Sequence, residues 1–139
     1  MQCQGMARTN YVKVADHAGL LKAIEPFCLK MVKRGEDYFG FITTSDSGWP
    51  SWGLTEADAE TGSREEVEFD FQEHIIPFLA DGEVLISQEA DYEGERYVSG
   101  LSRAFCKGKE PVFIGLDDIY AKAAEMFGCD VKTISEAAY

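Results

Sequence analysis

The chain has 139 residues, of which 45% are hydrophobic and 12% aromatic, and a formal net charge of −12 at pH 7. This length suits one domain with a single core, and the aromatic content excludes a disordered acidic tail, which would be poorer in aromatic residues. No apolar run approaches the roughly 20 residues of a membrane-spanning helix, and the N-terminus lacks the hydrophobic core of a signal peptide. We therefore expect a cytoplasmic protein with no membrane partner.

Regular patterning begins near Tyr11. Residues 1–10 are expected to form a flexible extension, with Met1 or Met6 as the start, and residues 11–139 to form a single domain. The first predicted elements are a strand over 10–15, a helix over 17–27 that Asp16 caps and Pro26 ends, and a β-hairpin of strands 29–34 and 38–44.

The rest of the chain repeats this alternation of strands and helices. It predicts a loop over 45–64, a strand over 65–71 and a short helix over 72–79. These are followed by a long hairpin over 83–105, a strand over 111–116 and a helix over 116–128. The last helix has apolar residues along one face and a glycine at its C-terminal cap; these are Ile119, Tyr120, Ala123, Ala124, Phe127 and Gly128. The predicted fold class is α+β, an antiparallel or mixed sheet with two or three helices on one face. The order β-α-β-β occurs twice, as it would after an internal duplication.

Residues 56–95 carry all of the net negative charge. This segment holds fourteen Asp and Glu against Arg64 alone, a net of −13, and the rest of the chain adds +1. Net charge says more about partners than about fold. A strongly negative protein repels phosphate, so we expect no direct binding of nucleic acid. The expected partner is a basic protein that itself binds nucleic acid.

Alternate positions of the predicted strands carry acids at the spacing of nucleic-acid phosphates. Side chains two residues apart on a strand lie about 6.6–6.8 Å apart, similar to successive phosphates along one strand. The acids at such positions are Glu66, Glu68 and Asp70 on one strand, and Glu89, Asp91, Glu93 and Glu95 through the hairpin, whose turn is expected to interrupt the second row. Such rows can imitate a nucleic-acid backbone and occupy a basic groove. The alternatives are a solvated acidic surface without a special role and a metal site.

Metal-binding patterns fail on spacing. Residues 56–60 alternate acids like the start of a calcium loop, but Thr61 stands where glycine is required and Val67 where a bidentate acid is required. His17 and His74 lie near no cysteine or second histidine, so a zinc site lacks its ligands. We therefore predict no metal and no cofactor.

Catalytic motifs are equally absent. The chain has no P-loop, no G-x-S-x-G elbow and no G-x-G-x-x-G, and its acids are too numerous for any pair to be singled out. We predict a protein that is not an enzyme. If there were a catalytic centre, it would lie where Glu73 and His74 face the tryptophan loop.

Trp49 and Trp52, the only tryptophans, flank Pro50 in a glycine-bounded loop beside the acidic segment. Tryptophan is enriched at binding hot spots because it supplies a large contact area. Either both indoles cap the core, or at least one is exposed and anchors a partner.

Five segments together give the chain a resemblance that runs from about Tyr11 to Gly128; they are "GWPSW", "VEFDF", "HIIPFLADGEV", "ERYVSG" and "LDDIYAKAAEMFG". With these segments the chain resembles small acidic proteins of bacteria, phages and other mobile elements, a likeness that implies no particular activity. In size and charge it is also similar to the anti-restriction and anti-CRISPR proteins that mimic DNA, a likeness of composition that assigns a role to no residue.

The leading hypothesis is a non-enzymatic inhibitor, such as a counter-defence protein, that occupies the basic nucleic-acid groove of its target. Its expected binding residues are Glu66, Glu68, Asp70, Glu89, Asp91, Glu93 and Glu95, with Trp49 or Trp52 as an apolar anchor. The first alternative is an immunity or adaptor protein that neutralises a basic toxin or enzyme, and the second is a small enzyme. An edge strand over residues 111–116 would also allow a homodimer.

Overall fold

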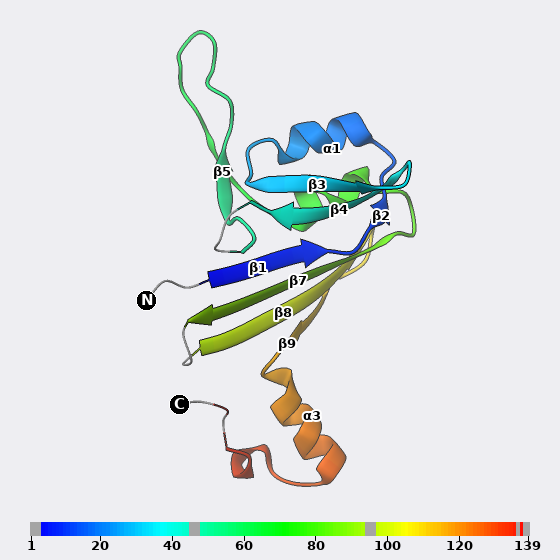
Figure 1. Ribbon diagram of the computed structural model, residues 1–139, viewed down its shortest axis with the longest axis vertical. Helices are drawn as coiled ribbons and strands as arrows, with labels where there is room; N and C mark the ends of the chain where they lie inside the picture. The colour runs from blue at the N-terminus through cyan, green and yellow to red at the C-terminus, as the bar shows by residue number, and fades with distance from the viewer. Residues whose placement is uncertain (1–3, 45–47, 94–96, 136, 138–139) are drawn as a thin grey trace.

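The computed structural model describes residues 4–44, 48–93, 97–135 and 137, and it has an α+β fold (Figure 1). The strands are β1 (Gln4–Thr9), β2 (Val12–Lys13), β3 (Leu29–Arg34), β4 (Tyr38–Thr43), β5 (Trp52–Leu54), β6 (Glu66–Glu68), β7 (Val84–Glu93), β8 (Tyr97–Cys106) and β9 (Val112–Gly115). The helices are α1 (His17–Ile24), α2 (Phe71–His74) and α3 (Asp118–Phe127), with 3-10 turns η1 (Ile76–Phe78) and η2 (Val131–Thr133). No described helix has the length and apolar character needed to cross a membrane.

Seven strands form one antiparallel sheet, and two form a separate ribbon. The order in the sheet is β2-β4-β1-β7-β8-β9, with β3 paired to β4, while β5 pairs with β6. The order β-α-β-β does occur twice, as β2-α1-β3-β4 and β6-α2-β7-β8. The two units are built differently, however, because β2 belongs to the main sheet and β6 to the ribbon.

The first strand, β1, lies inside the sheet between β4 and β7. It pairs with β7 along its whole length, from Gln4 opposite Tyr92 to Thr9 opposite Ser87. The expectation that residues 1–10 form a flexible extension is therefore wrong from Gln4 onward. Both partners of β1 lie far along the chain, and tertiary pairing of this kind leaves little mark on a short, mixed local sequence.

Asn10 connects β1 to β2. Its side-chain amide donates to the carbonyl of Val84 at 3.0 Å, and its Oδ1 accepts from the N–H of Ile86 at 2.8 Å. Its own backbone N–H donates to the carbonyl of Ile86 at 3.2 Å. These bonds continue the pairing with β7 at the point where the chain departs to pair β2 with β4.

The β3–β4 hairpin, the β7–β8 pairing, β9 and helix α3 confirm the predictions made from local patterns. At the end of α3, Gly128 adopts the left-handed conformation with φ 68° and ψ 37°, as a glycine C-cap does. Two elements differ from expectation. The loop over residues 45–64 contains β5, and the helix expected over 72–79 divides into α2 and η1 before Pro77, which has no N–H for a helical bond.

The core lies on one face of the sheet, beneath α1 and α2. The strand register places Phe41, Leu85 and Phe105 on this face, and α1 adds Leu20, which is fully buried. The remaining buried apolar residues of the cluster are Ala7, Val12, Val14, Ile24, Phe39, Trp49, Phe71, Ile75, Ile76 and Leu79. Helix α3 does not join them: it has no buried residue, and it continues from the end of β9 beyond the sheet (Figure 1).

Candidate functional site

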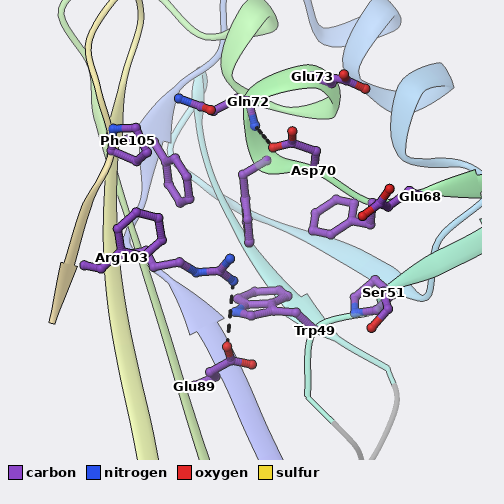
Figure 2. A pocket seen from close by; sticks show the side chains of 14 residues that line it. Trp49, Ser51, Glu68, Asp70, Gln72, Glu73, Glu89, Arg103 and Phe105 are labelled. Atoms are coloured by element: carbon purple, nitrogen blue, oxygen red, sulfur yellow. Dashed lines mark hydrogen bonds and ion pairs between the residues drawn. The ribbon is translucent and has the colours of Figure 1, made fainter. Parts of the chain in front are cut away.

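A pocket of about 560 Å³ lies where three parts of the chain meet (Figure 2). Its walls come from the tryptophan loop at residues 49–51, from residues 68–73 at the junction of β6 and α2, and from strands β7, β8 and β9. Four of its lining residues are acids, Glu68, Asp70, Glu73 and Glu89, and one, Arg103, is a base. The pocket therefore has three more negative than positive side chains.

The aromatic wall of the pocket is part of the core. Phe71 lies at its centre, with ring centroids 5.2 Å from Trp49, 4.9 Å from Phe69 and 5.1 Å from Phe105. Phe71 is only 2% exposed, so this wall is rigidly packed. The position of the acidic side chains around it is thereby tied to the core.

Arg103 lies across this wall. Its guanidinium carbon is 5.0 Å from the centroid of Phe71 and 5.8 Å from that of Phe105, within the range of cation–π attraction. Its Nη2 is 3.8 Å from Oε1 of Glu89, a long ion pair between side chains that are both about one-fifth exposed. A pair of this length holds Glu89 weakly, because the attraction competes with water and with side-chain entropy.

Asp70 has a structural role in addition to its charge. It is the N-cap of α2, and its Oδ1 accepts from the N–H of Gln72 at 2.9 Å. The His74 ring closes the same turn, with Nδ1 3.0 Å from the carbonyl oxygen of Asp70, and packs against Phe27 with ring centroids 4.8 Å apart. His74 therefore has a structural role at this turn.

Replacing Asp70 by alanine is expected to lower the free energy of unfolding by about 1 kcal/mol, because the N-cap of α2 is lost. Asp70→Asn should keep most of this stability, since an asparagine Oδ1 can accept the same bond, while it removes one charge from the pocket. Urea denaturation of both variants checks the prediction. Equal destabilisation by alanine and asparagine would show that charge, and not capping, is what Asp70 contributes to stability.

The structure brings part of the predicted acidic site together. Glu68, Asp70 and Glu89 line the pocket. Asp91 is the next residue on the same face of β7; a Cβ placed on Gly48 would lie 3.4 Å from Oε2 of Glu89 and 3.8 Å from Oδ1 of Asp91. The tryptophan loop thus runs close to these two acids.

The first row of acids differs from its predicted form. Strand β6 ends at Glu68, and Asp70 leaves the row to cap α2. In the second row, Glu89 and Asp91 lie on one continuous strand, β7, which ends at Glu93. The side chain of Glu93 and the whole of residue 95, the predicted Glu95, lie outside the described part of the chain.

The two tryptophans take different places. Trp49 is 9% exposed and belongs to the core, so Trp52 is the exposed one of the two tryptophans named as an anchor. Its ring nitrogen is buried without a hydrogen-bond partner among the described atoms, and it lies on the side of the indole that faces Glu89 and Arg103 (Figure 2). Trp52 is 57% exposed and pairs with Glu68 across the ribbon, so the two side chains share one face.

Leu54 and Glu66 form the next pair of this ribbon face. Leu54 is exposed, like Trp52. The face therefore alternates apolar and acidic side chains beside the pocket.

Sequence reasoning missed Arg103, Pro111 and Phe113 as pocket residues. Arg103 is opposite Ser87 in the β7–β8 register, which places it diagonal to Glu89 on the same face. The alternation of the strand that contains Arg103 and Phe105 was the available signal, but it needed the register to become a prediction. Of the expected catalytic pair, Glu73 lines the pocket and His74 does not.

A second, smaller site brings two acids into contact. Glu25, just after α1, and Glu56, just after β5, line a pocket of about 470 Å³ with Lys22 and Arg64. A side-chain hydrogen bond with Glu56, together with repulsion from its charge, raises the pKa of Glu25 above its usual 4.5. The shared proton favours the folded state below pH 4.5, and this contribution is lost as the pH rises through the raised pKa.

Replacing Glu25 by glutamine is therefore expected to raise the melting temperature slightly at neutral pH, because it removes repulsion between two ionised groups. Below the usual pKa of 4.5 the variant should have no advantage, since Glu25 is then protonated and makes its hydrogen bond with Glu56. Thermal unfolding at both pH values checks this, with Glu60→Gln as a control that removes an exposed acid of the same loop. An advantage that is equal at both pH values would contradict the shared proton.

Among the described residues no group of three or more His, Cys, Asp or Glu side chains is arranged to hold a metal ion. Comparisons with protein-family models, with curated proteins and with solved structures found no match.

Proposed function

We propose that this protein is a non-enzymatic inhibitor that binds the basic, nucleic-acid-binding surface of another protein. The observation that carries the proposal is the excess of carboxylates around one rigid aromatic pocket, four against the single cation Arg103. The pocket adjoins the acids of β7. The basic surface of a partner could contact both this pocket and the acids of β7.

The pocket suits the side chain of an arginine or lysine from the partner. A guanidinium can lie against aromatic rings, as Arg103 itself does, and a carboxylate can bind it with two parallel hydrogen bonds. Glu89 is such a carboxylate, since among the described residues only its long ion pair with Arg103 holds it, and Glu68 and Glu73 line the same pocket. An incoming cation would compete with Arg103 for Glu89.

The acids on β7 supply the likeness to nucleic acid. Glu89 and Asp91 are alternate residues of one strand, so their spacing is about 6.6–6.8 Å. A groove whose lysines and arginines are arranged for successive phosphates meets charges at a similar repeat, and it releases its bound anions on contact. Trp52 and Leu54 on the ribbon add exposed apolar area beside the acids, which charge alone would not provide.

The test is capture of host proteins on the immobilised protein, with elution first by competing duplex DNA or RNA and then by a salt gradient. We expect a nucleic-acid-binding protein to be displaced by the nucleic acid, and its binding to weaken steeply with salt. The combined variant Glu68→Gln, Glu89→Gln and Asp91→Asn should abolish its capture.

A matched variant controls for net charge. Glu60→Gln, Glu110→Gln and Glu125→Gln remove the same number of charges from exposed positions that do not line the main pocket, and they should leave capture nearly unchanged. The proposal fails if binding does not weaken with salt, or if charge reversal at Glu66, Glu68 and Asp70 leaves it intact. A partner that salt releases and nucleic acid does not would instead favour the immunity or adaptor role.

A further inference from the structure

The sheet has a second face that none of the described helices covers (Figure 1). Alternate residues of β7, β8 and β9 point away from the core onto this second face, and these residues are mostly small or apolar. Met6, Val84, Val112 and Ile114 are exposed apolar residues of this face, and each is between 46% and 78% exposed. From Val84 to Ala90 of β7, and at the described positions of β8 and β9, this face carries no charged side chain, while on β1 the same face carries Arg8, opposite Gln88.

Helix α3 has an apolar stripe that is equally uncovered. Ile119, Met126 and Phe127 are 63%, 68% and 82% exposed, and their spacing places them on one side of the helix. An amphipathic helix draws most of its stability from the burial of such a stripe. In a single chain, α3 therefore lacks the packing that stabilises a helix of this kind.

The junction between β9 and α3 directs the helix away from its own sheet. Leu116 packs over Gly100, so closely that a Cβ on this glycine would lie 3.0 Å from Cγ of Leu116. The N–H of Gly115 donates to Oδ2 of Asp118 at 2.5 Å, which fixes the first turn of α3 to the end of the strand. The helix thus lies beyond the sheet (Figure 1). Its stripe and the apolar residues of the sheet face are both largely exposed, so the two are not buried against each other within one chain.

Pairing of two β9 edges is a poor way to cover these surfaces. Pro111, just before the strand, has no N–H to donate, and the N–H of Gly115 is taken by Asp118. The N–H of Leu116 donates to the carbonyl of Gly100 on β8. In an antiparallel pair, alternate residues bond to the partner strand, so Phe113 is the residue of β9 whose N–H and C=O both point to the open edge. Two strands could exchange only the bonds of this one residue.

The uncovered area matches what a dimer needs. Taken with Leu116, the exposed apolar residues of the sheet face and the helix amount to on the order of 700 Å² on one copy. In a two-fold dimer each copy contributes both surfaces, and a standard interface buries about 800 Å² on each partner. The charge of the chain is no obstacle, since the acids around the main pocket lie on the other face of the sheet.

We propose that the protein is a homodimer in which α3 of each copy packs its apolar stripe on the uncovered sheet face of the other. The arrangement is a two-fold one, with two equal contacts between a helix and a sheet face. It does not depend on the function proposed above, because none of the dimer residues lines the main pocket.

Sedimentation equilibrium of the full chain in reductant tests the proposal. A dimer of twice 15.5 kDa is expected, and single charges on either surface, Ile114→Glu or Phe127→Glu, should each give a monomer that still unfolds cooperatively. Leu21→Glu is the matched control, an exposed apolar residue of α1, and it should remain a dimer.

Mixing the two monomeric variants distinguishes this arrangement from other dimers. The intact α3 of the Ile114→Glu chain can still pack on the intact face of the Phe127→Glu chain, so the mixture should recover a heterodimer that neither variant forms alone. A natural chain that is monomeric at all concentrations would overturn the proposal. So would a mixture that shows no recovery, or a dimer that persists in both variants.

Discussion

Replacing Phe71 by alanine should lower the free energy of unfolding by about 3–5 kcal/mol, the usual cost of removing a buried phenylalanine. The ring contacts Trp49, Phe69 and Phe105 and carries the guanidinium of Arg103 on one face. Its loss would leave a cavity beside the pocket and, among the described residues, would leave Arg103 with the Phe105 ring alone as an aromatic contact. Since small domains are stable by about 5–15 kcal/mol in total, a change of this size is a large share of the whole.

Urea denaturation followed by tryptophan fluorescence measures the effect, because Trp49 lies 5.2 Å from Phe71. Trp52→Ala is the control: this exposed side chain of the ribbon should cost less than about 1 kcal/mol when it is removed. A cost for Phe71→Ala as small as that of the control would mean that the aromatic wall is not part of the core.

Local signals in the sequence were sufficient wherever an element is stabilised by its own residues. The alternation of residues 29–34 and 38–44 predicted the β3–β4 hairpin, and Gly128 marked the end of α3. An N-cap or a C-cap acts within a few residues, so it can be read from the sequence without knowledge of the rest of the fold.

Elements that depend on distant partners could not be predicted in this way. Strand β1 owes its place to β4 and β7, and the ribbon strand β5 to β6. The same holds for the pocket, in which Arg103 meets Glu89 only through the β7–β8 register. The amphipathic pattern of α3 was correct, but a pattern does not reveal which surface will bury the stripe.

The acids illustrate how a structure divides residues that a sequence groups together. Glu66, Glu68 and Asp70 were expected to act alike, yet Glu66 lies on the ribbon, Glu68 lines the pocket and Asp70 caps a helix. Their charges still add to one negative region. Substitution of each acid should therefore change binding and stability to different extents. At Asp70, the alanine and asparagine variants separate the effect of the lost cap from that of the lost charge.

Replacing Gly53 by alanine should destabilise the protein by about 3 kcal/mol, at the upper end of the usual cost of overpacking. A Cβ at this position would overlap the carbonyl oxygen of Pro26, and it would lie 2.7 Å from the carbonyl carbon of Pro26 and 2.9 Å from Cδ1 of Phe27. Two of these three atoms are backbone, so they cannot turn aside as a flexible side chain can. The ribbon must move instead, and with it Trp52 and Glu68.

Gly115→Ala is the matched control, since it places the same methyl group on another strand glycine. Its Cβ would lie 3.6 Å from the carbonyl oxygen of Gly100 and 3.9 Å from Oδ2 of Asp118, which is ordinary contact, so its cost should stay within about 0.5 kcal/mol. Equal stability of the two variants would contradict the close approach of β5 to the chain after α1. If Gly53→Ala also weakens capture of a basic partner beyond its effect on folding, the position of the ribbon matters for binding, because the substitution itself removes no charge.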